Sequence, residues 1–123
     1  MEVTIQKFPH FELLSIIGRA DSAEAPRLEQ ALRAVIGRGM YKLVIDMSQL
    51  EYMSSAGLRA LAEAQRQVMH HNRGEMVLTQ VPDNVREALA LVGFTEHFKI
   101  IDPAASALAY MEKLPGSSSR RDA

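Results

Sequence analysis

Residues 42–47 constrain the fold more than any other segment of this chain. They form an apolar run of strand length, which is typical of a central strand covered on both faces. A short loop follows, and an amphipathic helical pattern then extends from about Ser55 to Asn72. A buried strand followed closely by a helix is the repeating unit of α/β proteins, so a parallel sheet flanked by helices is expected.

The segments on the N-terminal side extend this pattern. Residues 3–5 and 11–17 have strand character, and 8–10 join them as a hairpin. Asp21 is placed to cap a helix, with Glu24 at the spacing of a capping box. We expect that helix to end at the glycine-rich residues 37–39.

The C-terminal half alternates in the same way. We expect a strand at 76–81, a helix from Asp83 or Asn84 to Gly93, and a short strand at 99–101. Asp102 and Pro103 resemble an N-cap and first-turn proline of a last helix. The side chains expected to point inward are Leu58, Leu61, Ala62, Gln65, Val68 and Met69 in the second helix, Val85, Ala88, Leu89 and Val92 in the third, and Ala107, Leu108 and Met111 in the last.

The expected order is therefore ββαβαβαβα, an α/β domain with a mixed, mostly parallel sheet. We assign residues 1–114 to one domain and 115–123 to a polar, disordered tail. The formal net charge of −1 argues against a nucleic-acid binder. No apolar run reaches the roughly 18 residues of a membrane span, so we expect no membrane insertion and a cytoplasmic protein.

Several kinds of chemistry find little support. The chain has no cysteine, which excludes disulfides and zinc–thiolate sites, and its four histidines lack metal-ligand spacing, so no metal or cofactor is expected. Asp46 ends a strand, as the phosphoacceptor of a receiver domain does, but the acidic pair and the lysine that this chemistry needs are missing from the matching positions. A carboxylate that accepts hydrogen bonds from the loop backbone is the favoured interpretation of Asp46.

Ser54 and Ser55 stand where the second helix begins. Unpaired backbone N–H groups and the positive end of the helix dipole tolerate negative charge there, so a phosphoserine would be electrostatically favoured. Serine is also a preferred N-cap, and one of the two hydroxyls could do only that. Gly57 in the first turn indicates a close approach of the backbone or of a partner.

The stretch from Asp46 to Leu58 resembles the signature of STAS domains, particularly those of bacterial anti-sigma factor antagonists. The pattern is an aspartate, a serine two residues on, an aromatic residue, and then two serines and Gly–Leu near the helix start. The turn at 18–21 is similar to a second family motif, and the element order matches over about 1–114. Ser54 differs from the best-known members, which carry aspartate there.

The resemblance implies a partner-switching function without enzymatic activity. In the antagonists, the serine at the position of Ser55 is phosphorylated by a partner that is both anti-sigma factor and serine kinase; Ser54 is the second choice here. A serine phosphatase would reverse the modification. The residues implied to contact the partner are Asp21, Ser22, Ser54, Ser55, Gly57, Arg59, Glu63 and Arg66.

Two alternatives remain open at this point. A STAS subunit could serve as a docking block in another assembly, such as a lipid-transport or stress-signalling complex. A small enzyme or receiver-like phosphoacceptor using Asp46 is the less favoured alternative.

Overall fold

The computed structural model describes residues 1–71 and 73–114. Strands alternate with helices, as expected for an α/β protein. In chain order, the elements are β1 (Glu2–Lys7), β2 (Glu12–Ala20), α1 (Ala25–Gly37), β3 (Lys42–Asp46), β4 (Leu50–Met53), α2 (Ser55–His70), β5 (Glu75–Thr79), α3 (Asp83–Leu91), the 3-10 turn η1 (Thr95–His97), β6 (Lys99–Ile100) and α4 (Ala104–Glu112).

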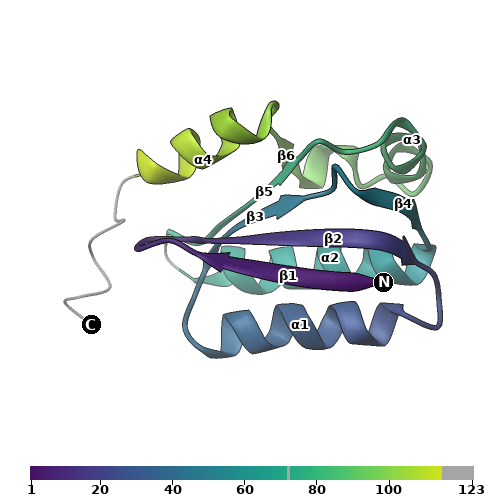
Figure 1. Cartoon of the computed structure of the whole chain (residues 1–123), viewed down its shortest axis with the longest axis horizontal. Coiled ribbons are helices and arrows are strands. Elements are labelled where there is room, and N and C mark those ends of the chain that lie inside the picture. Colours follow the sequence, from purple (N-terminus) through teal and green to yellow (C-terminus); the bar gives the residue numbers. More distant parts are fainter. Residues whose placement is uncertain (72, 115–123) are drawn as a thin grey trace.

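One mixed sheet forms the centre of the molecule, in the order β1-β2-β3-β5-β6. β1 pairs antiparallel with β2, and all other pairs are parallel. Helices α1 and α2 cover one face of the sheet and α4 lies on the other (Figure 1). The expected α/β class and mostly parallel sheet are confirmed.

Strand β4 was not expected from the sequence, which predicts a loop between residues 47 and 55. β2 is long enough to pair with β3 through its first half and with β4 through its end, from Gly18 to Ala20. β4 therefore takes the edge of β2 that β3 leaves free. This pairing delivers the chain directly to the start of α2.

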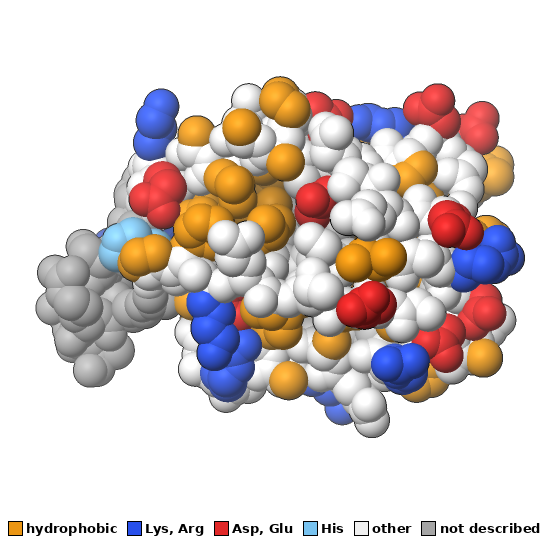
Figure 2. Space-filling model, in the orientation of Figure 1, with side chains coloured by type: hydrophobic (Ala, Val, Ile, Leu, Met, Phe, Trp, Pro, Cys, Tyr) orange, Lys and Arg blue, Asp and Glu red, His pale blue; other side chains and the backbone are white. Residues whose placement is uncertain are grey.

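Two hydrophobic clusters fill the two sides of the sheet. The larger lies between the sheet and α1 and α2, and includes buried residues from α3. The smaller lies under α4 and comprises Phe11, Val44, Val77, Ala107 and Met111. Partly buried apolar side chains pack around the smaller cluster, and Figure 2 shows hydrophobic side chains gathered beside α4.

Two side chains expected to point inward do not. Met69 on α2 is 53% exposed and Val92 after α3 is 43% exposed. The helical periodicity is correct in both places, but no neighbouring element covers the end of either helix far enough to bury them. Gln65, also expected inside, is only partly buried and donates a hydrogen bond to the carbonyl of His97.

Two expected helix caps also differ. Asp102 does not cap α4, because its carboxylate accepts hydrogen bonds from the backbone N–H of Gln80 at 2.7 Å and the guanidinium of Arg86 at 3.0 Å. Pro103 is the N-cap residue of α4 and does not lie in its first turn. Asp21 does accept a hydrogen bond from the backbone N–H of Glu24, but in a turn before α1, which begins at Ala25.

The tail expected at 115–123 lies outside the described residues. Within residues 1–71 and 73–114, no helix has both the length and the apolar character needed to cross a bilayer.

Candidate functional site

The junction between β4 and α2 gives two neighbouring serines different surroundings. Ser54 is buried and has the extended backbone of an N-cap residue, and its Oγ accepts a hydrogen bond from the N–H of Gly57 at 3.1 Å. Its own N–H donates to the carbonyl of Ala20 at 2.9 Å. Ser54 therefore has the structural capping role that the sequence allowed for either serine.

Ser55 is the first residue of α2 and is exposed. The first turn of α2 carries no acidic side chain. A negative charge on the Ser55 hydroxyl would thus lie at the positive end of the helix dipole without a carboxylate in that turn to repel it. The geometry makes Ser55 the accessible hydroxyl of the pair.

The loop after β2 lies next to this junction. The bond from Ser54 to Ala20 joins the end of β2 to the start of α2, and Asp21 then forms its turn with Glu24. Ser22 is exposed in this turn. The structure thus brings Asp21 and Ser22 close to the two serines, and their contact with a partner stays a prediction.

Gly57 is closely packed against the strands beneath α2. It is buried, and a Cβ added to it would overlap the side chain of Met53 and lie 3.4 Å from the carbonyl oxygen of Ala20. The absence of a side chain lets the first turn of α2 approach β4 and the end of β2. Gly57 therefore sets how closely the start of the helix approaches the sheet, and its contact with a partner stays a prediction.

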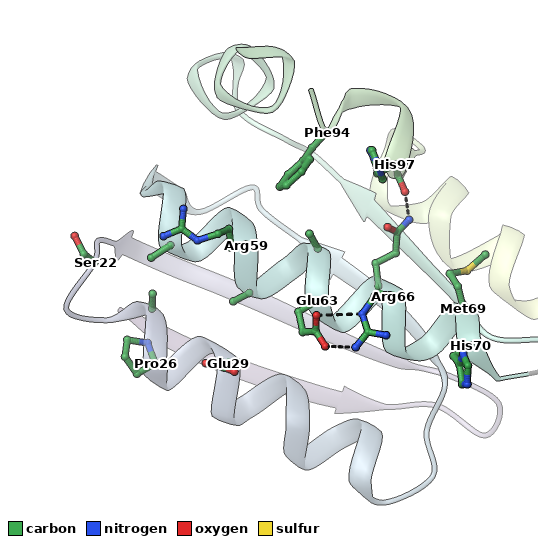
Figure 3. A pocket seen from close by; sticks show the side chains of 15 residues that line it. Ser22, Pro26, Glu29, Arg59, Glu63, Arg66, Met69, His70, Phe94 and His97 are labelled. Carbon is green, nitrogen blue, oxygen red and sulfur yellow. Dashed lines mark hydrogen bonds and ion pairs between the residues drawn. The ribbon is translucent and has the colours of Figure 1, made fainter. Parts of the chain in front are cut away.

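An open groove of about 1070 Å³ runs along the exposed side of α2. Ser22 and Pro26 line it from the α1 side, Arg59 and Met69 from α2, and Phe94 from the segment after α3 (Figure 3). The full lining is Ser22, Ala25, Pro26, Glu29, Ala56, Arg59, Ala60, Ala62, Glu63, Gln65, Arg66, Met69, His70, Phe94 and His97. The groove therefore begins next to Ser55 and brings together four of the expected contact residues, Ser22, Arg59, Glu63 and Arg66.

The charged side chains of this groove are unequally paired. Glu63 accepts hydrogen bonds from Arg66 and Gln67, and these hold the pKa of the Glu63 carboxyl below its ordinary value. The bond to Glu63 in turn raises the pKa of the Arg66 guanidinium. Glu29 accepts from Arg33 at 2.8 Å. Among residues 1–71 and 73–114, by contrast, Arg59 has no hydrogen-bond or ion-pair partner.

Some residues near the site were not singled out from the sequence. The guanidinium of Arg19 lies 4.7 Å from the ring centre of Tyr52 in a cation–π contact, next to β4. Met69 lies at the far end of the groove, and Phe94 lines the wall opposite the Arg59–Glu63 stretch of α2 (Figure 3). Met69 is an apolar position of the helical pattern, but nothing in the sequence indicates that Phe94 lines the groove from another element.

Asp46 has the favoured backbone-accepting role, since its Oδ1 accepts a hydrogen bond from the N–H of Ser48 at 2.9 Å. This contact orders the loop between β3 and β4. In the part of the chain that the structure describes, no three histidine, aspartate or glutamate side chains come together as a metal site would require.

Comparison with known proteins finds relatives that span nearly the whole chain. BtrV of Bordetella bronchiseptica, which carries the description of an anti-sigma factor antagonist, is 33% identical over 116 residues, spanning 94% of this chain and 99% of BtrV. The crystal structure of an anti-sigma factor antagonist from Mycobacterium paratuberculosis superimposes with a TM-score of 0.82 and 25% identity, covering 91% of this chain and 94% of that one.

The unphosphorylated anti-sigma factor antagonist SpoIIAA shares the fold at a TM-score of 0.74 and 13% identity, covering 91% of this chain and 99% of SpoIIAA. The family model of the STAS domain matches residues 2–107, which include both serines and all the residues that line the groove. This chain belongs to the STAS domain family.

Proposed function

We propose that this chain is an anti-sigma factor antagonist. In its unphosphorylated form it binds an anti-sigma factor that is also a serine kinase, and so frees a sigma factor for transcription. Phosphorylation of Ser55 ends this binding, and a serine phosphatase restores it. The chain is then the substrate and binding protein of a cytoplasmic switch, and catalysis belongs to its partners.

The position of Ser55 is the observation that supports this proposal most. Its hydroxyl is exposed at the start of α2, whereas the hydroxyl of Ser54 is occupied by the N–H of Gly57. Asp21, Ser22 and Arg59 come from two different elements to surround the same region. An exposed serine with charged and polar side chains beside it is accessible to a kinase that is also a binding partner, which supports the proposal.

A phosphate at Ser55 would act through charge and bulk. It adds about 1.5 to 2 negative charges at neutral pH. A partner surface fitted to a neutral hydroxyl would have to desolvate that dianion, at a cost of several kcal/mol. A loss of about 4 kcal/mol weakens binding about a thousandfold, which is enough to separate a micromolar complex.

The test is to incubate the chain with the anti-sigma factor kinase and ATP and to map the phosphate by mass spectrometry. We expect phosphate on Ser55 in the wild type and in Ser54→Ala. Ser55→Ala should carry none, yet bind the kinase with affinity near that of the unphosphorylated wild type. Phosphate on Ser54 alone, or no phosphate at all, would contradict the proposed switch.

A further inference from the structure

The two ends of the main sheet differ in how well they are protected. One end is β6, which has two residues and begins with the exposed Lys99. The other end is β1, which has six residues and pairs with β2 residue for residue without a bulge. Short length, charged side chains, prolines and bulges are the features that keep an edge strand from pairing with another chain. In β1 the only charges are at its ends, on Glu2 and Lys7, so its middle lacks all of these features.

The outer side of β1 carries backbone groups without a partner in the described part of the chain. Just beyond the strand, the N–H of Phe8 donates to the carbonyl of Phe11 at 2.9 Å. Hydrogen-bonded residues alternate with non-bonded ones along an antiparallel pair, so the even-numbered residues of β1 bond to β2. The N–H and C=O groups of Val3, Ile5 and Lys7 therefore point away from β2. Figure 1 shows β1 at the front of the sheet, with no described segment in front of it.

The side chains of β1 are also packed on one side only. Val3 is partly buried against the larger hydrophobic cluster, and Ile5 lies opposite Leu14 of the same cluster. Ile5 is nevertheless 42% exposed. Residues opposite each other on neighbouring strands pack together, so Ile5 has its neighbour on β2 and an open place on the outer side. A further strand beside β1 would fill that place.

We propose that β1 pairs antiparallel with β1 of a second copy of this chain, with Thr4 opposite Thr4 of the second copy. A two-fold axis at Thr4 sets Val3 opposite Ile5, and both have their backbone groups directed outward. On the other face of the sheet, the same axis sets the amide of Gln6 opposite the carboxylate of Glu2. The strand is thus complementary to itself, since apolar side chains meet apolar ones and an amide meets a carboxylate.

The neighbouring register is less complementary. An axis at Ile5 would also use the outward backbone groups, but it would set the charged Lys7 opposite the apolar Val3. The groove along α2 has no residue of β1 in its lining, so two copies joined at β1 each keep a groove of their own. The proposal is therefore independent of the proposed function.

Introduced cysteines test the pairing and its register, because the chain has no cysteine of its own. Thr4→Cys should form an intermolecular disulfide under mild oxidation, since the axis brings the two Cα atoms to about 4.5 Å, within the range of a disulfide. Gln6→Cys is the matched control on the same face of the same strand. Its two copies would be offset by four residues, or about 13 Å along the strands. A gel without reductant should show mostly dimer for Thr4→Cys and mostly monomer for Gln6→Cys.

A pair of charged variants tests the same contact in solution. Thr4→Lys and Thr4→Glu should each be monomeric, because each sets like charges opposite one another, and a mixture of the two should restore the dimer. Sedimentation equilibrium should give about twice 13.7 kDa for the wild type and for the mixture, and 13.7 kDa for each variant alone. Val92→Lys is the control, because it places a charge on an apolar residue of similar exposure, 43%, outside the sheet and should keep the dimer. All variants should keep the circular dichroism spectrum of the wild type.

Three results would overturn the proposal. The first is a wild type that stays at 13.7 kDa up to millimolar concentration, including one whose β1 pairs with a strand of a different protein. The second is a dimer that persists in both Thr4→Lys and Thr4→Glu, since the copies would then meet through another surface. The third is an efficient disulfide from Gln6→Cys or Ile5→Cys and none from Thr4→Cys, which would exclude the register centred on Thr4.

Discussion

At the scale of single residues, replacing the two serines at the start of α2 should lower the stability of the protein by different amounts. Ser54 is buried and caps the helix through Gly57, so Ser54→Ala should lower the free energy of unfolding by about 1 kcal/mol. Ser55 is exposed, and Ser55→Ala should change it by less than about 0.5 kcal/mol. Equilibrium urea denaturation of both variants measures the difference. An equal loss in the two variants would show that the cap is not specific to Ser54.

Gly57 gives a second prediction at this scale. From the sequence, Gly57→Val is expected to weaken kinase binding more than it lowers the melting temperature. The structure instead predicts that the main effect is on stability. The new side chain would overlap Met53 beneath the helix, which costs about 1 to 3 kcal/mol in the free energy of unfolding. Gly37→Ala is the control, since its Cβ meets nothing within 4 Å and alanine favours the helix. Thermal unfolding followed by circular dichroism compares the two, and a wild-type melting temperature in Gly57→Val would refute this account.

At the scale of elements, Asp102 ties together three parts of the chain. Its carboxylate holds the residue after β5, through the N–H of Gln80, and a side chain of α3, through Arg86. Asp102→Ala should therefore lower the free energy of unfolding by about 1 to 2 kcal/mol. Glu112→Ala is the matched control on α4, because Glu112 is exposed. Equal denaturation midpoints for the two variants would show that this tie contributes nothing.

The elements also show how far the sequence alone could go. The order of helices and main strands followed from apolar periodicity, which is a local property. β4 could not be found in this way, because residues 50–53 become a strand only by pairing with the end of β2, more than thirty positions earlier in the chain. The local propensity of Asp102 predicts a helix cap. In the structure its carboxylate instead binds the backbone after β5 and a side chain of α3.

In the candidate site, too, some features follow from the sequence and others depend on tertiary packing. The motif placed Ser55, Arg59, Glu63 and Arg66 on one helix, and their common surface followed from helical spacing. The wall opposite α2 could not be predicted, because Phe94 and His97 reach it only through the packing of the segment after α3. The site residues on α2 could therefore be predicted from the sequence, whereas the shape of the groove depends on the tertiary fold.

At the scale of the whole molecule, the remaining prediction concerns how the phosphate transmits its effect. Ser55 is exposed at the end of one helix, and the strands beneath it are closely packed on both faces. A packed sheet has no second arrangement of similar free energy, so we expect the change to stay local. Amide chemical shifts should change near Ser22 and at 52–60, and β3 and β5 should keep their hydrogen-exchange protection.

Phosphomimetic variants extend this argument. Ser55→Asp and Ser55→Glu should impair kinase binding while leaving the fold intact, although one carboxylate carries less charge than a phosphate. A rearrangement of β3 or β5 on phosphorylation would contradict the local mechanism, because it would require a two-state element in the core. The bond from Ser54 to Ala20 and the burial of Gly57 both hold the start of α2 against the sheet. We therefore expect a phosphate on Ser55 to change what the surface presents to a partner and to leave the sheet beneath it in place.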